Sequence, residues 1–299
     1  MKTIELKITD ELSGKDIKSI LFNHLKLSAH LVTKLKKNDG IKLNFEHATV
    51  RKIVSSDDIL TITLPDENSK NIPPTPIELD IIYEDEDILL VNKPAFMPTH
   101  PSIGNYKNTL ANAVMYYYKD TNFVFRAVNR LDRDTTGLVL IAKNQYSANI
   151  LNQQIKKRAI KKEYLAICSG IPENDIGTIE APIGRIDKSI IKRAVSPDGQ
   201  YAKTDYEVIG KENGNSLVKL TLHTGRTHQI RVHMAHIGCP LYADFIYGTE
   251  IEGERTRLHC HRLEFSHPST NKTLSFTSPV PDDFFITDKT TANERNAKN

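Results

Sequence analysis

The first 70 residues show two helical and two strand-like patterns of apolar positions. Apolar residues recur at helical spacing over residues 15–25 and 29–36, and they alternate with polar residues over 41–45 and 59–64. Two amphipathic helices and a small antiparallel hairpin satisfy these periods. The pattern therefore predicts a small α/β module, within the size range that can fold alone.

A proline-rich segment separates this module from the rest of the chain. Residues 71–76 include three prolines in four positions, which favours a stiff extended linker over a helix or a central strand. Residues 77–287 then form a second, larger domain. Residues 288–299 carry no large apolar side chain and are expected to form a disordered tail. The predicted organisation is a module over residues 1–70, a linker, one large domain and a tail.

The second domain begins with strand patterns. Apolar runs at residues 81–83 and 88–91 flank the acidic residues 84–87, which predicts a hairpin whose tip is solvated and has no chemical role. Continuous apolar runs follow at residues 123–128 and 138–142, as expected of buried strands. The second domain is therefore expected to start with a hairpin and continue with strands of the core.

Composition and charge narrow the class of protein. Of 299 residues, 39% are hydrophobic and 26% are charged, which is ordinary for a globular protein and excludes a fully disordered chain. The net charge of +3 does not by itself indicate a nucleic-acid partner. The sequence has no apolar stretch of membrane-spanning length and no signal peptide. Three well-separated cysteines fit neither a disulfide scaffold nor a zinc ribbon. We therefore expect a cytoplasmic protein without a membrane partner.

Residues 129–137 form a polar loop between two predicted buried strands. The loop holds two carboxylates, Asp132 and Asp134, and two arginines. Loops on rigid strands often position catalytic groups. Two carboxylates would also suit a glycoside hydrolase if they lay about 5–9 Å apart. Aspartates frequently cap turns, however, and residue type alone favours that role for both.

A second polar stretch runs from residue 222 to residue 238. A strand over residues 217–223 precedes it, and Thr227 is expected to cap a helix that ends at Gly238. Arg231 would then project from the first turns of this helix. Its fixed fork of donors could be directed at a carboxylate or a phosphate.

Four histidines between residues 223 and 236 raise the question of a zinc site. His228 and His233 are five residues apart, which places them off a common helix face. No glutamate stands at the metalloprotease spacing from His233 and His236. We therefore favour histidines that form hydrogen bonds in a polar groove, and we expect no metal.

Two basic clusters could contact a nucleic acid. Lys156, Lys157 and Arg158 open a run of five basic residues in seven that leads directly to Tyr164, so charge and a stacking face lie side by side. A lysine cluster also closes the second helix of the first module: Lys34, Lys36 and Lys37. Each cluster could equally be a solvated helix surface.

Three motifs of the second domain resemble those of the RluA-type pseudouridine synthases, which modify uridines in large-subunit ribosomal RNA and in transfer RNA. The catalytic loop of that family, His/Asn-Arg-Leu-Asp-x-x-Thr-Ser/Thr-Gly, stands at residues 129–137. Its tyrosine motif, Lys-x-Tyr-x-Ala, stands at residues 162–166. Its late motif, Thr-Gly-Arg-x-His-Gln-Ile/Leu-Arg-x-His, stands at residues 224–233. With further agreement over residues 82–94 and 238–248, the resemblance covers nearly the whole domain.

This resemblance implies a fold and a set of residue roles. The fold is α+β, with a mixed, mainly antiparallel sheet and a central cleft. Asp132 is implied to be the catalytic carboxylate, with Tyr164 stacked on the target base and Arg231 as the partner of Asp132. Arg130 is implied to help hold the displaced nucleotide, and Asp134 belongs to the loop. We expect Arg231 to keep Asp132 ionised, and we expect no cofactor because the isomerisation involves no net redox change.

The first module is similar to the small RNA-binding fold named after ribosomal small-subunit protein S-four. The whole chain is therefore expected to be an isomerase that converts specific uridines of ribosomal or transfer RNA to pseudouridine. The basic clusters at residues 34–37 and 156–158 are expected to bind RNA. A catalytically silent RNA-binding protein that assists ribosome assembly is the alternative, and a zinc hydrolase built on the histidines is a third hypothesis.

Overall fold

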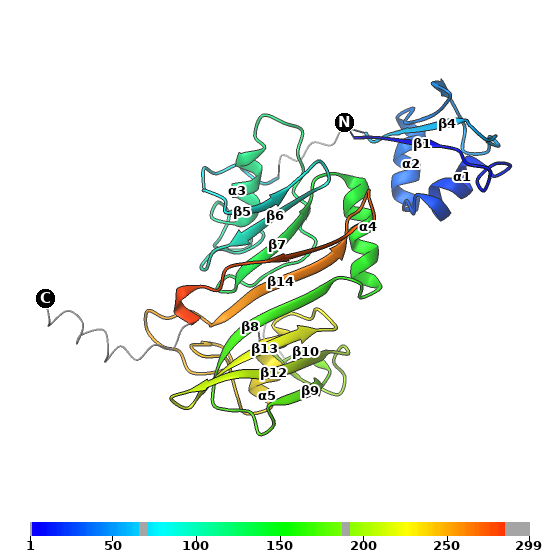
Figure 1. The fold of residues 1–299 in the computed structure, drawn as a ribbon. Helices are drawn as coiled ribbons and strands as arrows, with labels where there is room; N and C mark the ends of the chain where they lie inside the picture. Colours follow the sequence, from blue (N-terminus) through cyan, green and yellow to red (C-terminus); the bar gives the residue numbers. More distant parts are fainter. Residues whose placement is uncertain (1, 66–70, 187–191, 285–299) are drawn as a thin grey trace, which may run out of the picture.

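The protein is described by a computed structural model over residues 2–65, 71–186 and 192–284. The described residues form two main hydrophobic cores. The first is built from side chains between Ile8 and Leu64, joined by Tyr146 from the second half of the chain. The larger core is built from side chains between Ile88 and Phe265. The N-terminal module accordingly lies to one side of a large sheet (Figure 1). The predicted tail at residues 288–299 lies outside the described residues.

The N-terminal module is a four-stranded sheet with short helices. The strand order is β1 (Thr3–Lys7), β4 (Ile59–Thr63), β2 (Ile41–Leu43), β3 (Glu46–His47). The second predicted helix is confirmed as α2 (Ala29–Lys37), which Ser28 caps by accepting a backbone N–H. The first is a single turn, α1 (Ile17–Ser19), that continues as the π-helical η1 (Ile20–His24). β1 and β3 are additions to the predicted hairpin.

The larger domain is built on a nine-stranded sheet in the order β5-β6-β7-β14-β8-β13-β12-β9, with β15 paired to β14. The strands are β5 (Ile81–Glu84), β6 (Ile88–Lys93), β7 (Thr136–Ala142), β8 (Lys161–Ser169), β9 (Ile176–Glu180), β12 (Lys203–Glu212), β13 (Asn215–Leu222), β14 (Leu258–Ser266) and β15 (Thr273–Thr277). Among the described strand pairs, β7 and β14 alone run parallel. The expected mixed, mainly antiparallel sheet is therefore confirmed.

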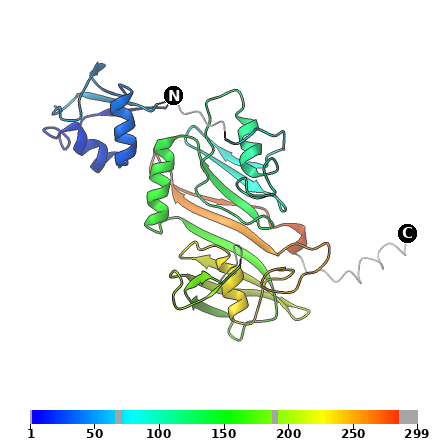
Figure 2. The same ribbon diagram turned by 180° about the vertical axis from the view of Figure 1, so that it is seen from behind.

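Short helices and one hairpin complete the domain. They are α3 (Leu110–Tyr117), α4 (Gln145–Lys156), α5 (Gln229–His236), the 3-10 helix η2 (Asp282–Phe284), and the hairpin of β10 (Ile183–Arg185) and β11 (Arg193–Val195). Helix α4 lies between the N-terminal module and the long strands in both views (Figure 2). In the part of the chain that the structure describes, no helix has the length and apolar character required to cross a membrane.

Helix α4 also joins the two cores. Tyr146 and Ile150 project from α4 into the core of the N-terminal module. On the same helix, the side-chain amides of Asn149 and Gln153 each donate a hydrogen bond of 2.6 Å to the backbone carbonyl of Lys26. The module is therefore attached to the larger domain through apolar packing as well as through the linker.

The apolar run at residues 123–128 does not form the predicted strand. Phe123 and Phe125 are buried, but the segment meets β7 only through one isolated bridge at Ala127 and two backbone hydrogen bonds. β14 pairs with β7 only near the start of β7, so the far part of that edge remains open to this irregular segment. The segment leads directly into the polar loop at residues 129–137.

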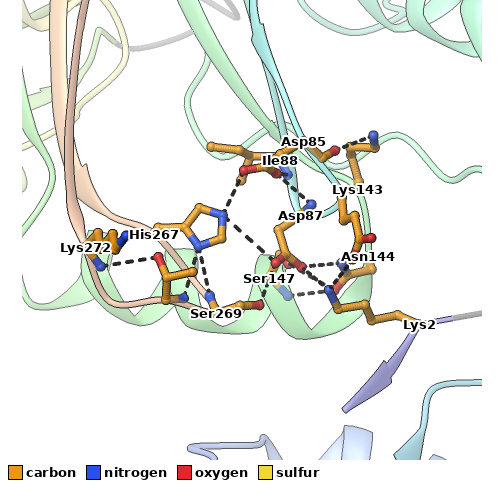
Figure 3. A network of polar contacts seen from close by, with 12 residues as sticks. Lys2, Asp85, Asp87, Ile88, Lys143, Asn144, Ser147, His267, Ser269 and Lys272 are labelled. Carbon is orange, nitrogen blue, oxygen red and sulfur yellow. Dashed lines mark hydrogen bonds and ion pairs between the residues drawn. The ribbon is translucent and has the colours of Figure 1, made fainter. Parts of the chain in front are cut away.

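The acidic hairpin tip is not the solvated turn that the sequence predicts. Asp87 is almost fully buried, and its carboxylate accepts hydrogen bonds from Asn144 and Ser147 at the start of α4. The hydroxyl of Ser269, in the turn between β14 and β15, donates to the same carboxylate (Figure 3). Segments far away in the sequence thus close over the tip, and a local pattern cannot reveal them.

Candidate active site

A cavity of about 670 Å³ opens where the loop before β7 meets the loop before α5. The end of α4 and the start of β8 complete its walls. The cavity brings together six of the residues singled out from the sequence: Arg130, Asp132, Lys156, Arg158, Tyr164 and Arg231. Lys157 does not line it, and Lys34, Lys36 and Lys37 lie in the last turn of α2 in the N-terminal module.

Asp132 lies on the cavity wall with one carboxylate oxygen engaged. Its side chain is 34% exposed, and Oδ2 lies 3.3 Å from Nη1 of Arg231. Nε2 of His228 lies 3.8 Å from the same oxygen. The pairing of Asp132 with Arg231 that the resemblance implies is therefore present. Among the described residues, Oδ1 accepts no hydrogen bond.

Arg231 is held by a carboxylate that the sequence analysis missed. Its Nε and Nη2 donate to Asp244 at 2.7 and 2.6 Å. Asp244 is fully buried and also accepts two backbone N–H groups from the residues that follow it. Burial alone lowers the pKa of Arg231, but hydrogen bonds and charge from Asp244 and Asp132 raise it above its ordinary value. The one sequence signal for Asp244 is its place within residues 238–248, where the family resemblance continues.

Side-chain hydrogen bonds hold the loop that carries Asp132. Oδ1 of Asn129 accepts the backbone N–H of Leu140 at 2.8 Å, and its Nδ2 donates to the carbonyl of Leu138 at 3.0 Å. The hydroxyl of Thr99 donates to the carbonyl of Leu131 at 2.8 Å. The side chain of Asn129 thus makes the hydrogen bonds to β7 that a neighbouring strand would otherwise make. Together with Thr99, it fixes the backbone on both sides of Arg130.

Asp134 does not share the cavity with Asp132. It is buried, and its carboxylate forms an ion pair with Arg133 at 2.8 Å. The backbone carbonyl of Asp134 accepts a hydrogen bond from Arg255. Because Asp134 does not line the cavity, the two carboxylates are not arranged as the facing pair of a glycoside hydrolase.

Tyr164 forms an apolar wall of the cavity. It lies in β8, opposite Cys260 of β14, and is buried. Burial is the main cause that raises the pKa of Tyr164 well above its usual value, with Cys260 acting in the same direction. Burial also lowers the pKa of Lys162, which lines the same cavity. Tyr164 therefore presents a neutral phenol ring.

The start of α5 differs from the prediction. Thr227 does not cap the helix; the cap position is His228, which adopts a left-handed backbone with φ 57° and makes no side-chain cap bond. The side chain of Gln229 fixes this turn instead, because its Oε1 accepts hydrogen bonds from the hydroxyl of Thr224 and the backbone N–H of Arg226. Capping preferences depend on the residue type at the cap position, and they do not register the contacts of Gln229, so they selected the wrong residue.

The histidines form hydrogen bonds with protein groups. Nδ1 of His233 lies 2.9 Å from the hydroxyl of Thr204, and its Nε2 lies 2.9 Å from the carbonyl of Ala181. His223 contacts the carboxylate of Asp205. Within the described ranges, no three His, Cys, Asp or Glu side chains come close enough together to hold a metal ion.

A second cavity of about 430 Å³ continues from the first. The two share residues 225–227, and the second is lined by three arginines, Arg185, Arg193 and Arg226, with Asp198 as the one acidic residue. Arg226 is oriented by hydrogen bonds to the backbone carbonyl of residue 201 and the side chain of residue 200. The hairpin of β10 and β11 thus extends the polar surface around Asp132.

Comparisons with known proteins agree on one family. The profile of the RNA pseudouridylate synthase family matches residues 87–236. The chain is 39% identical over 264 residues to "Uncharacterized RNA pseudouridine synthase YjbO" of Bacillus subtilis (strain 168), covering 87% of this chain and 93% of that protein. It is 35% identical over 300 residues to "Ribosomal large subunit pseudouridine synthase D" of Neisseria meningitidis serogroup B, covering 94% of this chain and 80% of that protein. The solved structure of "Human RNA Pseudouridylate Synthase Domain Containing 1" is similar with a TM-score of 0.59 and 25% identity, over 76% of this chain and 98% of that one.

Proposed function

The chain belongs to the RNA pseudouridylate synthase family and is an RNA pseudouridine synthase, an isomerase, and we propose that Asp132 is its catalytic carboxylate. The placement of Asp132 carries this proposal. It is the one carboxylate in the lining of the main cavity, and its oxygen Oδ1 has no partner among the described residues. A group poised in this way can reach a substrate without first breaking an ion pair.

The reaction changes the uracil atom that is bonded to the ribose. The bond between N1 of uracil and C1′ of the ribose breaks, the base turns, and a bond forms between C5 and C1′, while C5 loses a proton and N1 gains one. An ionised carboxylate can promote this by adding to C1′ or by removing a neighbouring ribose proton. In either route Arg231, whose pKa is raised, places a charged guanidinium beside Oδ2 of Asp132.

Tyr164 and Arg130 complete the proposed nucleotide site. A base within a helix cannot react, so the target uridine must be unpaired or turned out of its stack. The buried ring of Tyr164 offers a face on which the displaced uracil can stack. Arg130 lines the same cavity and is placed to hold the phosphate of the displaced nucleotide.

Basic groups on both sides of the cavity define a path for the RNA backbone. Lys156 and Arg158 line the cavity on the α4 side, and Arg185 and Arg226 line the second cavity. We assign Lys157 to the same α4 side. Charged side chains in such positions bind phosphates independently of base sequence.

The names of several relatives support the substrate class that we propose. Several relatives are named as ribosomal large subunit pseudouridine synthases, so large-subunit ribosomal RNA is the substrate that we propose, acted on in the cytoplasm without a cofactor. The N-terminal module resembles the S-four type of RNA-binding fold, and we propose that it adds affinity through Lys34, Lys36 and Lys37. A silent RNA-binding protein is not favoured, because binding alone needs no aspartate at this position.

Tritium release tests the role of Asp132. Unmodified transcripts of large-subunit ribosomal RNA, labelled with tritium at C5 of uracil, lose the label when C5 bonds to the ribose. Wild-type protein should release tritium, and the Asp132→Asn variant should bind the same RNA without release. Release by the variant at a wild-type rate contradicts the assignment. RNA binding without release by the wild type would instead support a catalytically silent RNA-binding protein.

A further inference from the structure

His228 occupies an unusual position beside the proposed catalytic carboxylate. Its left-handed φ of 57° is a conformation in which His, Asn and Asp are the most frequent residues other than Gly. A residue in this position usually caps the helix with its side chain, but His228 makes no such bond. Its imidazole is 11% exposed and lies between Asp132 and Tyr247. The side chain of His228 therefore contacts other residues of the cavity and does not cap the helix.

Two contacts of Tyr247 favour one position for the ring proton of His228. The backbone N–H of Arg193, at the start of β11, donates to the hydroxyl of Tyr247 at 2.9 Å. The same hydroxyl lies 2.9 Å from Nδ1 of His228. The hydroxyl accepts from Arg193, and Nδ1 of His228 is the one acceptor that the described residues offer to its own hydrogen, which favours donation to Nδ1. Nδ1 is then the acceptor, and the proton is on Nε2.

The imidazole is neutral in this environment. Burial is the main cause that lowers the pKa of His228 below its ordinary value. The negative charges of Asp132 and Asp244 oppose this shift, and the positive charges of Arg231 and Arg193 reinforce it. A neutral ring of this tautomer presents a single N–H, at Nε2, to the carboxylate of Asp132.

The two cationic or donor groups near Asp132 converge on one oxygen. Nη1 of Arg231 lies 3.3 Å and Nε2 of His228 lies 3.8 Å from Oδ2. We propose that His228 is a positioning residue for Asp132: when RNA binds, the Nε2–H of His228 and the guanidinium of Arg231 both hold Oδ2, which leaves Oδ1 to meet the ribose. This inference rests on the proposed catalytic role of Asp132.

The distance of 3.8 Å between Nε2 of His228 and Oδ2 of Asp132 is too long for a hydrogen bond. Hydrogen bonds among catalytic groups are often long before the substrate binds and shorten in the complex. A rotation of the Asp132 side chain that brings Oδ1 to the sugar can close the remaining gap at Oδ2. His228 then limits the carboxylate to one orientation, and Tyr247 limits His228 to one tautomer.

Two substitutions of His228 separate this role from a structural one. Asn tolerates the left-handed backbone and can still meet Tyr247, but it is too short to reach Asp132. Gln places an amide N–H close to the position of Nε2. The His228→Asn variant should lose about tenfold in the single-turnover rate of tritium release from labelled large-subunit ribosomal RNA transcripts. The His228→Gln variant should stay within about threefold of wild type, and both should bind the RNA within about twofold of wild type.

The outcomes are distinguishable from those for Asp132. A wild-type rate for His228→Asn, or equal losses in the Asn and Gln variants, overturns the positioning role even if Asp132→Asn is inactive. Activity of Asp132→Asn would refute the proposed function instead. Tyr247→Phe keeps the ring beside Arg231 but removes the hydroxyl, so the rate should fall by about threefold with unchanged RNA affinity. An unchanged rate for Tyr247→Phe overturns the tautomer control.

Discussion

The hairpin tip at residues 84–87 and the main cavity each hold a largely buried histidine close to an aspartate. At the hairpin tip, Nε2 of His267 lies 2.9 Å from Asp85, with Asp87 beside them (Figure 3). In the cavity, Nε2 of His228 approaches Asp132. Nδ1 of His267 accepts the backbone N–H of Thr270, and Nδ1 of His228 lies 2.9 Å from the hydroxyl of Tyr247.

The carboxylates of Asp87 and Asp132 differ in the number of hydrogen-bond donors that contact them. Asp87 has a side chain that is 4% exposed, and hydroxyl, amide and ammonium donors occupy both of its oxygens. Asp132 is 34% exposed and has only one hydrogen-bonded oxygen. A saturated carboxylate joins segments of the fold, whereas an unsaturated one retains the lone pairs that chemistry requires.

Removing the anchor of Arg231 should have the largest effect. Asp244→Asn retains shape but removes the charge that holds the buried guanidinium by two short hydrogen bonds. Arg231 would then be free to shift away from Asp132 or to bind it too tightly. We expect tritium release to fall by a factor of about 100 or more, and the free energy of unfolding to fall by about 3 kcal/mol. Tritium release and denaturant unfolding measure the two effects. Wild-type turnover in this variant would show that Arg231 needs no anchor.

Substitution of Asp87, whose two carboxylate oxygens both accept donors, should lower the stability of the fold and leave turnover unchanged. Asp87→Asn removes the acceptor charge of a buried network and should lower the free energy of unfolding by about 2 kcal/mol at pH 7. Turnover below the unfolding temperature should not change, because Asp87 does not line the cavity. Denaturant unfolding and tritium release on the same preparation check this prediction. A loss of turnover without a loss of stability would mean that Asp87 affects the geometry of the active site.

The pH dependence of this loss has a definite sign. Burial raises the pKa of Asp87, but hydrogen bonds from Ser269, Asn144 and Ser147 lower it below the ordinary value. A carboxylate with a lowered pKa in the folded state contributes stability above the pKa of the unfolded chain, about 3.9. That contribution disappears as the pH falls through the folded-state pKa. The difference between wild type and Asp87→Asn should therefore shrink below about pH 4.

The same comparison shows which parts of the site can be predicted from sequence. Asp132 and Tyr164 lie in short motifs next to strands whose apolar runs are continuous, so both the residues and their rigid support are visible in the sequence. Asp244 lies on an irregular segment, and its bond to Arg231 depends on how that segment folds back. Asp87 is a similar case, because its donors come from α4 and from the turn after β14. Local patterns identify turns and caps, but they do not reveal which distant groups close over them.

The same contrast holds for the basic residues, some of which are paired with a carboxylate and some of which are not. Substituting an unpaired lysine has the smallest expected effect. Lys161 is paired with Glu264 at 2.6 Å, whereas Lys156 lines the cavity and has no partner among the described residues. Lys156→Gln should weaken RNA binding by about threefold at 0.1 M salt and reduce the slope of log affinity against log salt by about one. Lys161→Gln, the matched control from the same basic run, should leave the slope unchanged. Filter binding over a range of salt concentrations measures both slopes, and equal slopes for the two variants would place the RNA backbone away from the end of α4.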